Sequence, residues 1–184
     1  METADLIVTA TTAHFDGIVA VGFFATEDDH SPFVVVRFLA DGGLDRGFGR
    51  AGVVTAAVGT CDDQAVDVGV QRDGKIVVVG TSFDFGGGSK IAVLRFLPDG
   101  TLDPTFGDGG WVALRLGRGY DQAESLELAD DDTLRILVEP GAAPGRRTLV
   151  LGGRGESLFP ASPVLHWGPW TKTQPTTAPG KPPT

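Results

Sequence analysis

Cysteine and basic residues are scarce in this sequence of 184 residues. Cys61 is the only cysteine, so no intrachain disulfide framework can form, although a single thiol is compatible with either redox compartment. Lysine and arginine together number 15 against 24 aspartates and glutamates, which gives a net charge of −9. Nucleic acids and anionic membrane surfaces are bound through a basic face, so this balance argues against both as partners. We interpret the acidity as a source of solubility.

Long apolar runs and helical patterns are also missing. No run approaches the roughly 18 apolar residues of a membrane span, and no segment keeps a helical period over about ten residues. Residues 1–5, Met-Glu-Thr-Ala-Asp, lack the basic region and apolar core of a signal peptide. The localisation is therefore left open. As written the chain is expected to be cytoplasmic, or its true start is missing.

What the sequence does contain is a repeat with an offset of 58 residues. Residues 31–80 match residues 89–138 at 18 of 50 positions without a gap. The densest part, 37–49, recurs as 95–107, and a worn third copy of one strand lies at 134–138. Further matches at the same offset are Gly52 with Gly110, and residues 63–65 with 121–123. Gapless identity of this extent indicates a tandem repeat, the sequence signature of a repeat architecture.

Four short strands are expected within one period. Residues 66–71 alternate valine with polar or small residues, the period of a half-buried strand. Asp73-Gly74 predicts a tight hairpin turn, because both residues tolerate the positive φ that such turns need. Residues 76–79 form a β-branched run, which suits a strand covered on both faces. The third and fourth strands are expected at 91–97 and at 111–114, the latter matching 53–57 one period earlier.

Four strands per period, with the same turn chemistry each time, predict a β-propeller blade. Blades are apolar on both faces, so neighbouring blades must stack. We expect an all-β array over residues 1–155, with units at about 1–58, 59–116 and 117–155 that stop just short of three blades. Seven of the twelve prolines lie in residues 160–184. Because such a segment buries little surface, residues 156–184 are predicted to be a disordered tail.

One motif in the middle unit is specific enough to suggest a family. It consists of Asp-Gly-Lys-Ile-Val-Val-Val-Gly at 73–80, a strand ending in Leu-Arg-Phe at 94–96, and Asp-Gly-Thr-Leu-Asp-Pro-Thr-Phe-Gly at 99–107. This order resembles the delta-60 repeat of bacterial proteins. The resemblance implies a β-propeller, often in secreted or surface-associated multidomain proteins, and it brings no established catalytic activity or site residues. Complete arrays of this family carry more repeats, so ring closure is left open.

Charged residues repeat with the units. Arg37 and Arg95 are each followed by phenylalanine, and Asp45 and Asp103 come eight residues later. These pairs could face a ligand in a central channel, or each arginine could bind the following turn by a charge-assisted hydrogen bond. We favour the second interpretation, since ligand sites in repeat proteins arise where the repeats differ. The structural repeat positions are Arg37, Asp41, Asp45, Phe48, Arg95, Asp99, Asp103 and Phe106, of which the two phenylalanines are expected to anchor the core between blades.

No motif for a metal, a cofactor or catalysis emerges from the sequence. The acidic clusters at 28–29, 62–63 and 130–132 lack the alternating ligands and central glycine of an EF-hand, so solvated turns are expected and calcium binding is left open. The glycine runs at 86–88 and 152–155 lack the lysine and hydroxyl of a phosphate loop. The three histidines, His14, His30 and His166, have no metal-ligand spacing, and no nucleophile motif is present.

Three hypotheses for function follow. The first is a non-catalytic binding or structural module that holds a protein or carbohydrate partner. The second is a propeller-type hydrolase or lyase, which would require non-repeated loop residues to converge; the candidates are Glu27, Asp28, His30, Asp84 and Tyr120. The third is a partial array without independent function, which would be expected to self-associate through exposed blade faces.

Overall fold

The computed structural model describes residues 5–15, 17–25, 30–117, 119–141 and 145–151. All regular elements in these ranges are strands, eleven in number. The first sheet contains β1 (Asp5–His14), β2 (Gly17–Ala25), β3 (Phe33–Phe38) and β4 (Val53–Ala56). The second contains β5 (Asp63–Val70), β6 (Ile76–Phe83), β7 (Ser89–Phe96) and β8 (Trp111–Leu114). The third contains β9 (Gln122–Leu128), β10 (Leu134–Glu139) and β11 (Arg147–Leu151).

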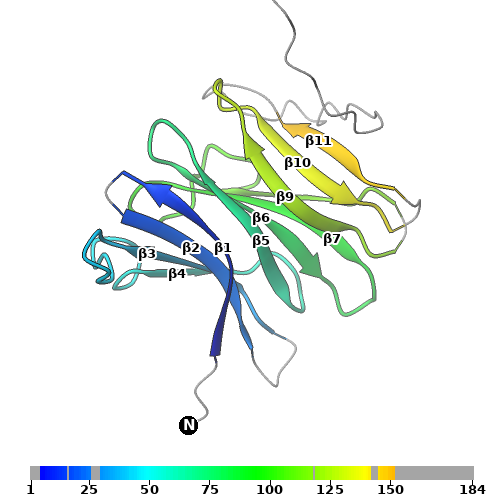
Figure 1. Cartoon of the computed structure of the whole chain (residues 1–184). Coiled ribbons are helices and arrows are strands. Elements are labelled where there is room, and N and C mark those ends of the chain that lie inside the picture. Colours follow the sequence, from blue (N-terminus) through cyan, green and yellow to red (C-terminus); the bar gives the residue numbers. More distant parts are fainter. Residues whose placement is uncertain (1–4, 16, 26–29, 118, 142–144, 152–184) are drawn as a thin grey trace, which may run out of the picture.

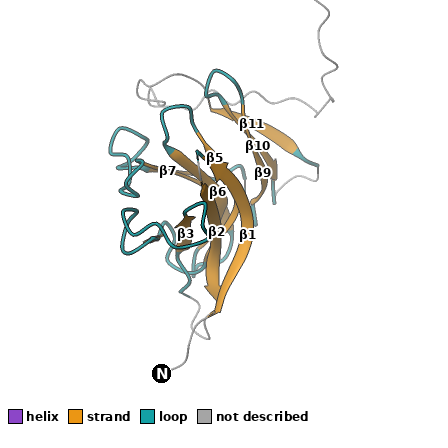
Figure 2. Ribbon diagram, turned by 60° about the vertical axis from the view of Figure 1, so that its left-hand side comes forward, coloured by secondary structure: helices purple, strands orange, loops and turns teal. Residues whose placement is uncertain are grey.

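Each sheet is an antiparallel meander in which every strand pairs with the next along the chain (Figure 1). The strands recur at the offset of 58 residues, most clearly in β4 and β8, which begin at Val53 and Trp111. The three sheets lie side by side in chain order (Figure 2), and the described strands do not close into a ring. The fold is therefore all-β and built of blades of the β-propeller type, as the sequence predicted.

The hairpin turns follow from local chemistry. Gly74 and Gly100 each follow an aspartate and adopt φ values of 84° and 90°, a conformation that costs glycine nothing because it has no Cβ. The third sheet has Asp132 at this position with φ of 63°. Aspartate is among the few other residues that tolerate the left-handed region. The worn third copy thus keeps the geometry of the turn without its glycine.

Alternate residues of the middle strands face the two neighbouring sheets, which explains why β6 is buried along most of its length. One apolar core joins the first two sheets, where Val19, Val21 and Phe33 meet Ile76 and Val78. A second core joins the second and third sheets. Its buried members include Val77, Val79, Ile91, Leu134, Ile136 and Leu149. Stacking of apolar faces between neighbours is therefore what stabilises each blade, as in other repeat proteins.

The first strands of the sheets lie next to one another, with β5 between β1 and β9. One repeat position joins them by polar contacts. The Thr9 hydroxyl donates to the carbonyl of Ala65 at 2.8 Å. Asp67, one period later, accepts from the backbone N–H of Leu126 at 2.7 Å. Both contacts lie at β-bulges, where the regular ladder of the strand pair is interrupted.

The gapless repeat ends in the third sheet because one hairpin is shortened there. Ile18 pairs with Phe38 and Ile76 with Phe96, whereas Leu134 pairs with Leu151, so the β10–β11 hairpin is three residues shorter. This deletion explains why the similarity to the other units fades after residue 138. The domain limits at 1–155 and 156–184 stay predictions, since residues 152–184 lie outside the described part of the chain.

Candidate functional site

The repeated arginines and aspartates come together in the first two sheets, at the turn between the third and fourth strands. Arg37 Nε donates to Asp45 Oδ2 at 2.8 Å, and Arg95 Nε donates to Asp103 Oδ2 at the same distance. Each guanidinium also lies 4.6 Å from the centre of a buried ring, that of Phe48 in the first sheet and Phe106 in the second. The two sites have the same geometry, so the repeat extends to its side chains.

The other two repeated aspartates, Asp41 and Asp99, hold tight turns. Asp41 Oδ1 accepts from the N–H of Gly43 at 2.8 Å, and Asp99 Oδ1 accepts from the N–H of Thr101 at 2.9 Å. These are side-chain-to-backbone bonds two residues ahead, which stabilise turns in the way a backbone hydrogen bond does. The carboxylates are thus engaged within their own loops.

The two arginine–aspartate pairs differ in their surroundings. The side chains of Arg95 and Asp103 are 4% and 2% exposed, against 12% and 22% for the pair in the first sheet. Burial raises the pKa of Asp103, but hydrogen bonds from Thr105 and the charges of Arg95 and Lys75 outweigh it and bring the pKa to about 2. In the more exposed pair, a backbone hydrogen bond from Gly47 and the Arg37 side chain lower the pKa of Asp45.

A repeated contact that we did not predict joins one sheet to the next. Asp63 and Asp121 are fully buried, and each accepts from the backbone of the preceding loop, from Val58 N–H at 2.8 Å and from Leu116 N–H at 2.7 Å. Each also meets a serine of the previous sheet. Asp63 N–H donates to the Ser31 carbonyl at 2.7 Å, and Ser89 Oγ donates to the Asp121 carbonyl at 2.6 Å. The sequence showed these aspartates as repeat positions, but not the loops that they hold.

A pocket of about 370 Å³ lies beside these aspartates, since the chain neighbours of Asp63 and Asp121 are among its lining residues. Three separate segments form it: the connection from the first to the second sheet with the start of β5, the end of β6 with the β6–β7 loop, and Tyr120 in the connection from β8 to β9. It is lined by Cys61, Asp62, Gln64, Phe83, Asp84, Phe85, Gly87, Gly88 and Tyr120. We call it the Phe85–Tyr120 pocket, after the two lining aromatic residues with large exposed fractions, 62% and 58%.

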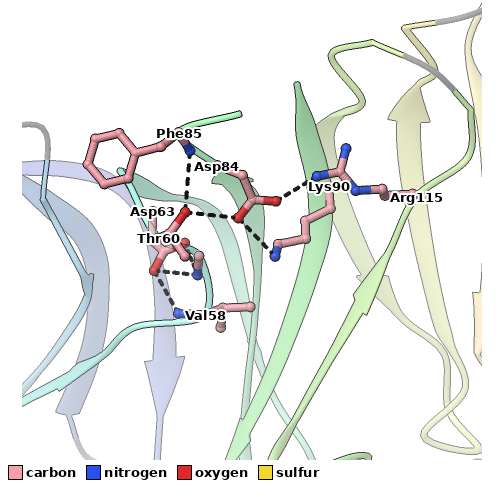
Figure 3. Close-up of polar contacts among 8 residues, drawn as sticks. Val58, Thr60, Asp63, Asp84, Phe85, Lys90 and Arg115 are labelled. Atoms are coloured by element: carbon pink, nitrogen blue, oxygen red, sulfur yellow. Dashed lines mark hydrogen bonds and ion pairs between the residues drawn. The ribbon is translucent and has the colours of Figure 1, made fainter. Parts of the chain in front are cut away.

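Asp84 is the centre of the polar contacts at this pocket (Figure 3). Its Oδ1 lies 3.2 Å from Lys90 Nζ and its Oδ2 lies 2.6 Å from Arg115 Nη2. The Thr60 hydroxyl lies 3.5 Å from Asp84 Oδ1 and accepts from the N–H of Phe85 at 3.3 Å. One carboxylate therefore ties the β6–β7 loop to β7, to the segment after β8 and to the connection between the sheets.

Asp84, which lines the pocket, and Asp63, which is buried beside it, have pKa shifts of opposite sign. Burial raises the pKa of Asp63, more than the neighbouring Ser82 hydroxyl and the backbone hydrogen bonds from Val58 and Gly59 lower it. Burial also acts to raise the pKa of Asp84, but the hydrogen bond and charge of Lys90, with the contacts of Thr60 and Arg115, lower it overall. Asp84 therefore stays ionised near neutral pH, balanced by two cations.

The structure places the non-repeated loop residues as follows. Asp84 and Tyr120 line the same pocket, and the ring of His30 lies 5.1 Å from that of Phe85. Glu27 and Asp28 lie outside the described residues. Lys90 and Arg115 also differ between units, since Pro32 and Ala57 stand one period earlier. A comparison of the units position by position would have found both cations.

The remaining sequence candidates do not add a second site. Asp131 accepts from the N–H of Thr133 in the β9–β10 turn, and Gly87 and Gly88 line the pocket. Within the described residues, no group of three or more His, Cys, Asp or Glu side chains could hold a metal ion. No helix in this part of the chain is long and apolar enough to cross a membrane. Residues 28–29 and 152–155 and His166 lie outside it.

A second hollow, of about 450 Å³, lies where the first two sheets meet at their outer turns. It is lined by Gly49, Arg50, Val53, Val54, Thr55 and Gly100. Most of its wall is backbone and aliphatic side chain, and Arg50 is its one charged lining residue. It offers fewer groups for ligand recognition than the Phe85–Tyr120 pocket.

Comparison with known proteins agrees with the fold. A family described as "Domain of unknown function (DUF5122) beta-propeller" matches residues 71–106. The matched stretch contains β6, β7 and the turn with Asp99 and Asp103, and it supports a β-propeller repeat family. No curated protein matches the chain. The family description assigns no ligand or activity.

Proposed function

We propose that this chain is a non-catalytic binding module of the β-propeller type, whose ligand occupies the Phe85–Tyr120 pocket. One observation carries the proposal. Residues that differ between the units come together from three separate segments around a single pocket of about 370 Å³. Binding sites in repeat folds are built where repeats depart from one another, on loops that a rigid scaffold positions. The ligand belongs to one of two classes, a carbohydrate or a protein.

The contacts of the repeated charged residues support the same proposal. Arg95 and Asp103 are buried and form an ion pair with each other. Asp103 also accepts a hydrogen bond from Thr105 and lies within ion-pair distance of Lys75. Arg37 additionally donates to the carbonyl of Pro98 in the second sheet. We infer that these positions fasten turns and join neighbouring blades, as favoured from the sequence, which leaves the pocket as the place for a ligand.

Two features weigh against the alternative of a hydrolase or lyase. Asp84, one of the two acids that line the pocket, is held ionised by Lys90 and Arg115, so it is a poor proton donor near neutral pH. Asp63 has the raised pKa that a general acid needs, but its side chain is fully buried and bonded to Val58 and Gly59. A catalytic acid must reach the atom that it protonates.

The proposal is tested by binding of the purified chain to arrays of glycans and peptides. The F85A/Y120A double variant is expected to lose the binding shown by the wild-type chain. Phe15→Ala is the matched control, because Phe15 is 80% exposed and does not line the pocket. Absence of binding across both arrays at high protein concentration, or binding that survives in the double variant, would overturn the proposal.

A further inference from the structure

We infer that the Phe85–Tyr120 pocket takes an uncharged sugar; this inference rests on the proposed function and names its ligand class. The pocket combines two exposed aromatic rings with a charge-balanced set of polar groups. Sugars are the common ligands that have both an apolar C–H face and a rim of hydroxyls that donate and accept. The rings, the charges and the size each bear on this assignment.

The aromatic rings provide the apolar surface. Phe85 and Tyr120 are 62% and 58% exposed, although each carries a large apolar area whose burial is favourable. Phe85 is fixed in place, because its N–H donates to Thr60 Oγ1 and its ring packs against that of His30 (Figure 3 shows the Thr60 contact). A ring held in this way can stack on a sugar without first being ordered, which lowers the cost of binding.

The charges of the side chains that line the pocket and of their ion-pair partners cancel. Asp62 and Asp84 contribute two negative charges, and Lys90 and Arg115 contribute two positive charges through their contacts with Asp84. The carboxylates would repel a phosphate and the cations would repel an ammonium group, so neither ligand gains a net electrostatic attraction. An uncharged ligand avoids both penalties. It can still hydrogen-bond to these groups, since ionised donors and acceptors make the stronger bonds.

The shape of the pocket favours a small ligand. Gly87 and Gly88 have φ values of 80° and 94° and no side chain, so backbone forms part of the wall. Gln64 adds an amide that can both donate and accept. A volume of about 370 Å³ lies at the lower end of the range for ligand pockets, which suits one or two sugar rings better than a folded partner.

Titrations followed by backbone amide NMR test the inference. The probes are cellotetraose, mannotetraose, chitotetraose and galactobiose, and the comparison probes are choline, an arginine-containing peptide and inorganic phosphate. At least one sugar is expected to bind with a Kd in the range of about 0.1 to 1 mM and to shift the amides of Gln64, Gly87 and Gly88. Choline, the peptide and phosphate are expected to leave these amides unchanged.

The variants make the result specific to the pocket. Phe85→Ala is expected to weaken sugar binding by about ten-fold and Phe85→Trp to retain it, while Phe15→Ala serves as the control. Saturable chemical-shift changes at the same amides with choline, the peptide or phosphate, but not with a sugar, would overturn this inference and leave the proposed function standing. If no probe shifts them, or if sugar binding is unaffected in Phe85→Ala, the sugar assignment fails. The glycan and peptide arrays then decide the proposed function separately.

Discussion

At the scale of single residues, repetition and burial divide the charged side chains into two groups. Arginine and aspartate that recur with the units, such as Arg95 and Asp103, are bonded to each other and to their own turns. Asp84, Lys90 and Arg115 occur once, and their contacts bring separate segments together beside an open pocket. We propose that the first group stabilises the first two blades and that the second distinguishes this chain from others with the same fold.

The pH dependence of the unfolding free energy is expected to show the contribution of the Asp103 carboxylate to stability. Its pKa is about 2 in the folded chain and near 3.8 otherwise, so the unfolded chain takes up the proton first as the pH falls. The stabilisation is therefore complete above about pH 4 and is lost between about pH 4 and 2, with a size on the order of 2 kcal/mol. Urea unfolding at a series of pH values measures this loss.

Asp103→Asn provides the comparison for that experiment. The variant is expected to be less stable at neutral pH by about 3 kcal/mol, because buried Arg95 loses its counter-charge. It should also show a smaller loss of stability between pH 4 and 2 than the wild-type chain. Asp45→Asn, at the same repeat position but more exposed, should change less in both respects. Parallel acid curves for the wild type and Asp103→Asn would contradict the assignment.

At the scale of strands and turns, the periodic pattern predicted most of the fold. The alternation in 66–71, the β-branched run at 76–79 and the short apolar segments at 53–57 and 111–114 fall on strands of the structure, except for residues 71 and 57, which each lie one position past a strand end. They could be predicted because the side-chain period of a strand and the φ preferences of its turns are local properties. The shortened β10–β11 hairpin was missed, since a deletion removes the offset by which repeats are aligned.

The candidate site was harder to predict, because it depends on contacts between sheets. The sequence marked Asp84, Tyr120 and His30 as loop residues that differ between units, and the structure brings all three to or beside one pocket. It gave no role to Lys90, which lies within a strand, or to Phe85, whose exposure depends on how the loop is held. Pattern within one unit carries no information about which loops of neighbouring units meet.

The β8–β9 connection and the start of the β10–β11 connection are expected to depend on Asp121. Asp121→Ala removes the acceptor of the N–H groups of Leu116 and Gly141, which lie 2.7 and 3.0 Å from its carboxylate. We expect a loss of about 2 to 4 kcal/mol in unfolding free energy, because the donors are left without partners. Hydrogen exchange at these two amides should accelerate more than at the amides of the third sheet's strands.

Asp131→Ala is the matched control for this substitution. Asp131 also accepts a backbone hydrogen bond, from Thr133, but it lies in an exposed turn where water can replace the carboxylate. Its effect on stability is expected to be below about 1 kcal/mol. Exchange rates at Leu116 and Gly141 that stay unchanged in Asp121→Ala would show that the carboxylate does not hold the loop.

At the scale of the whole molecule, the two ends of the stack of sheets differ in character. On the face of the third sheet turned away from the second, Arg135 pairs with Glu127 at 3.2 Å. The strand register of the first sheet instead places Leu6, Val8 and Ile18 together on its outer face, with exposed fractions of 37%, 51% and 49%.

A difference in exposure between equivalent positions of the first two sheets predicts that this apolar face is a contact surface. Ile76 is fully buried against the first sheet, whereas Ile18, one period earlier, is half exposed. The polar face of the third sheet does not complement it, so we expect two copies of the chain to associate through their first sheets, related by a two-fold axis. Sedimentation velocity over a concentration series should show a dimer for the wild-type chain and a monomer for Ile18→Lys. The reason is that burial of an unpaired charge in an apolar contact is more unfavourable than the contact is favourable. Arg135→Ala, at the opposite end, should leave the dimer unchanged. A wild-type chain that stays monomeric throughout the series would contradict the prediction.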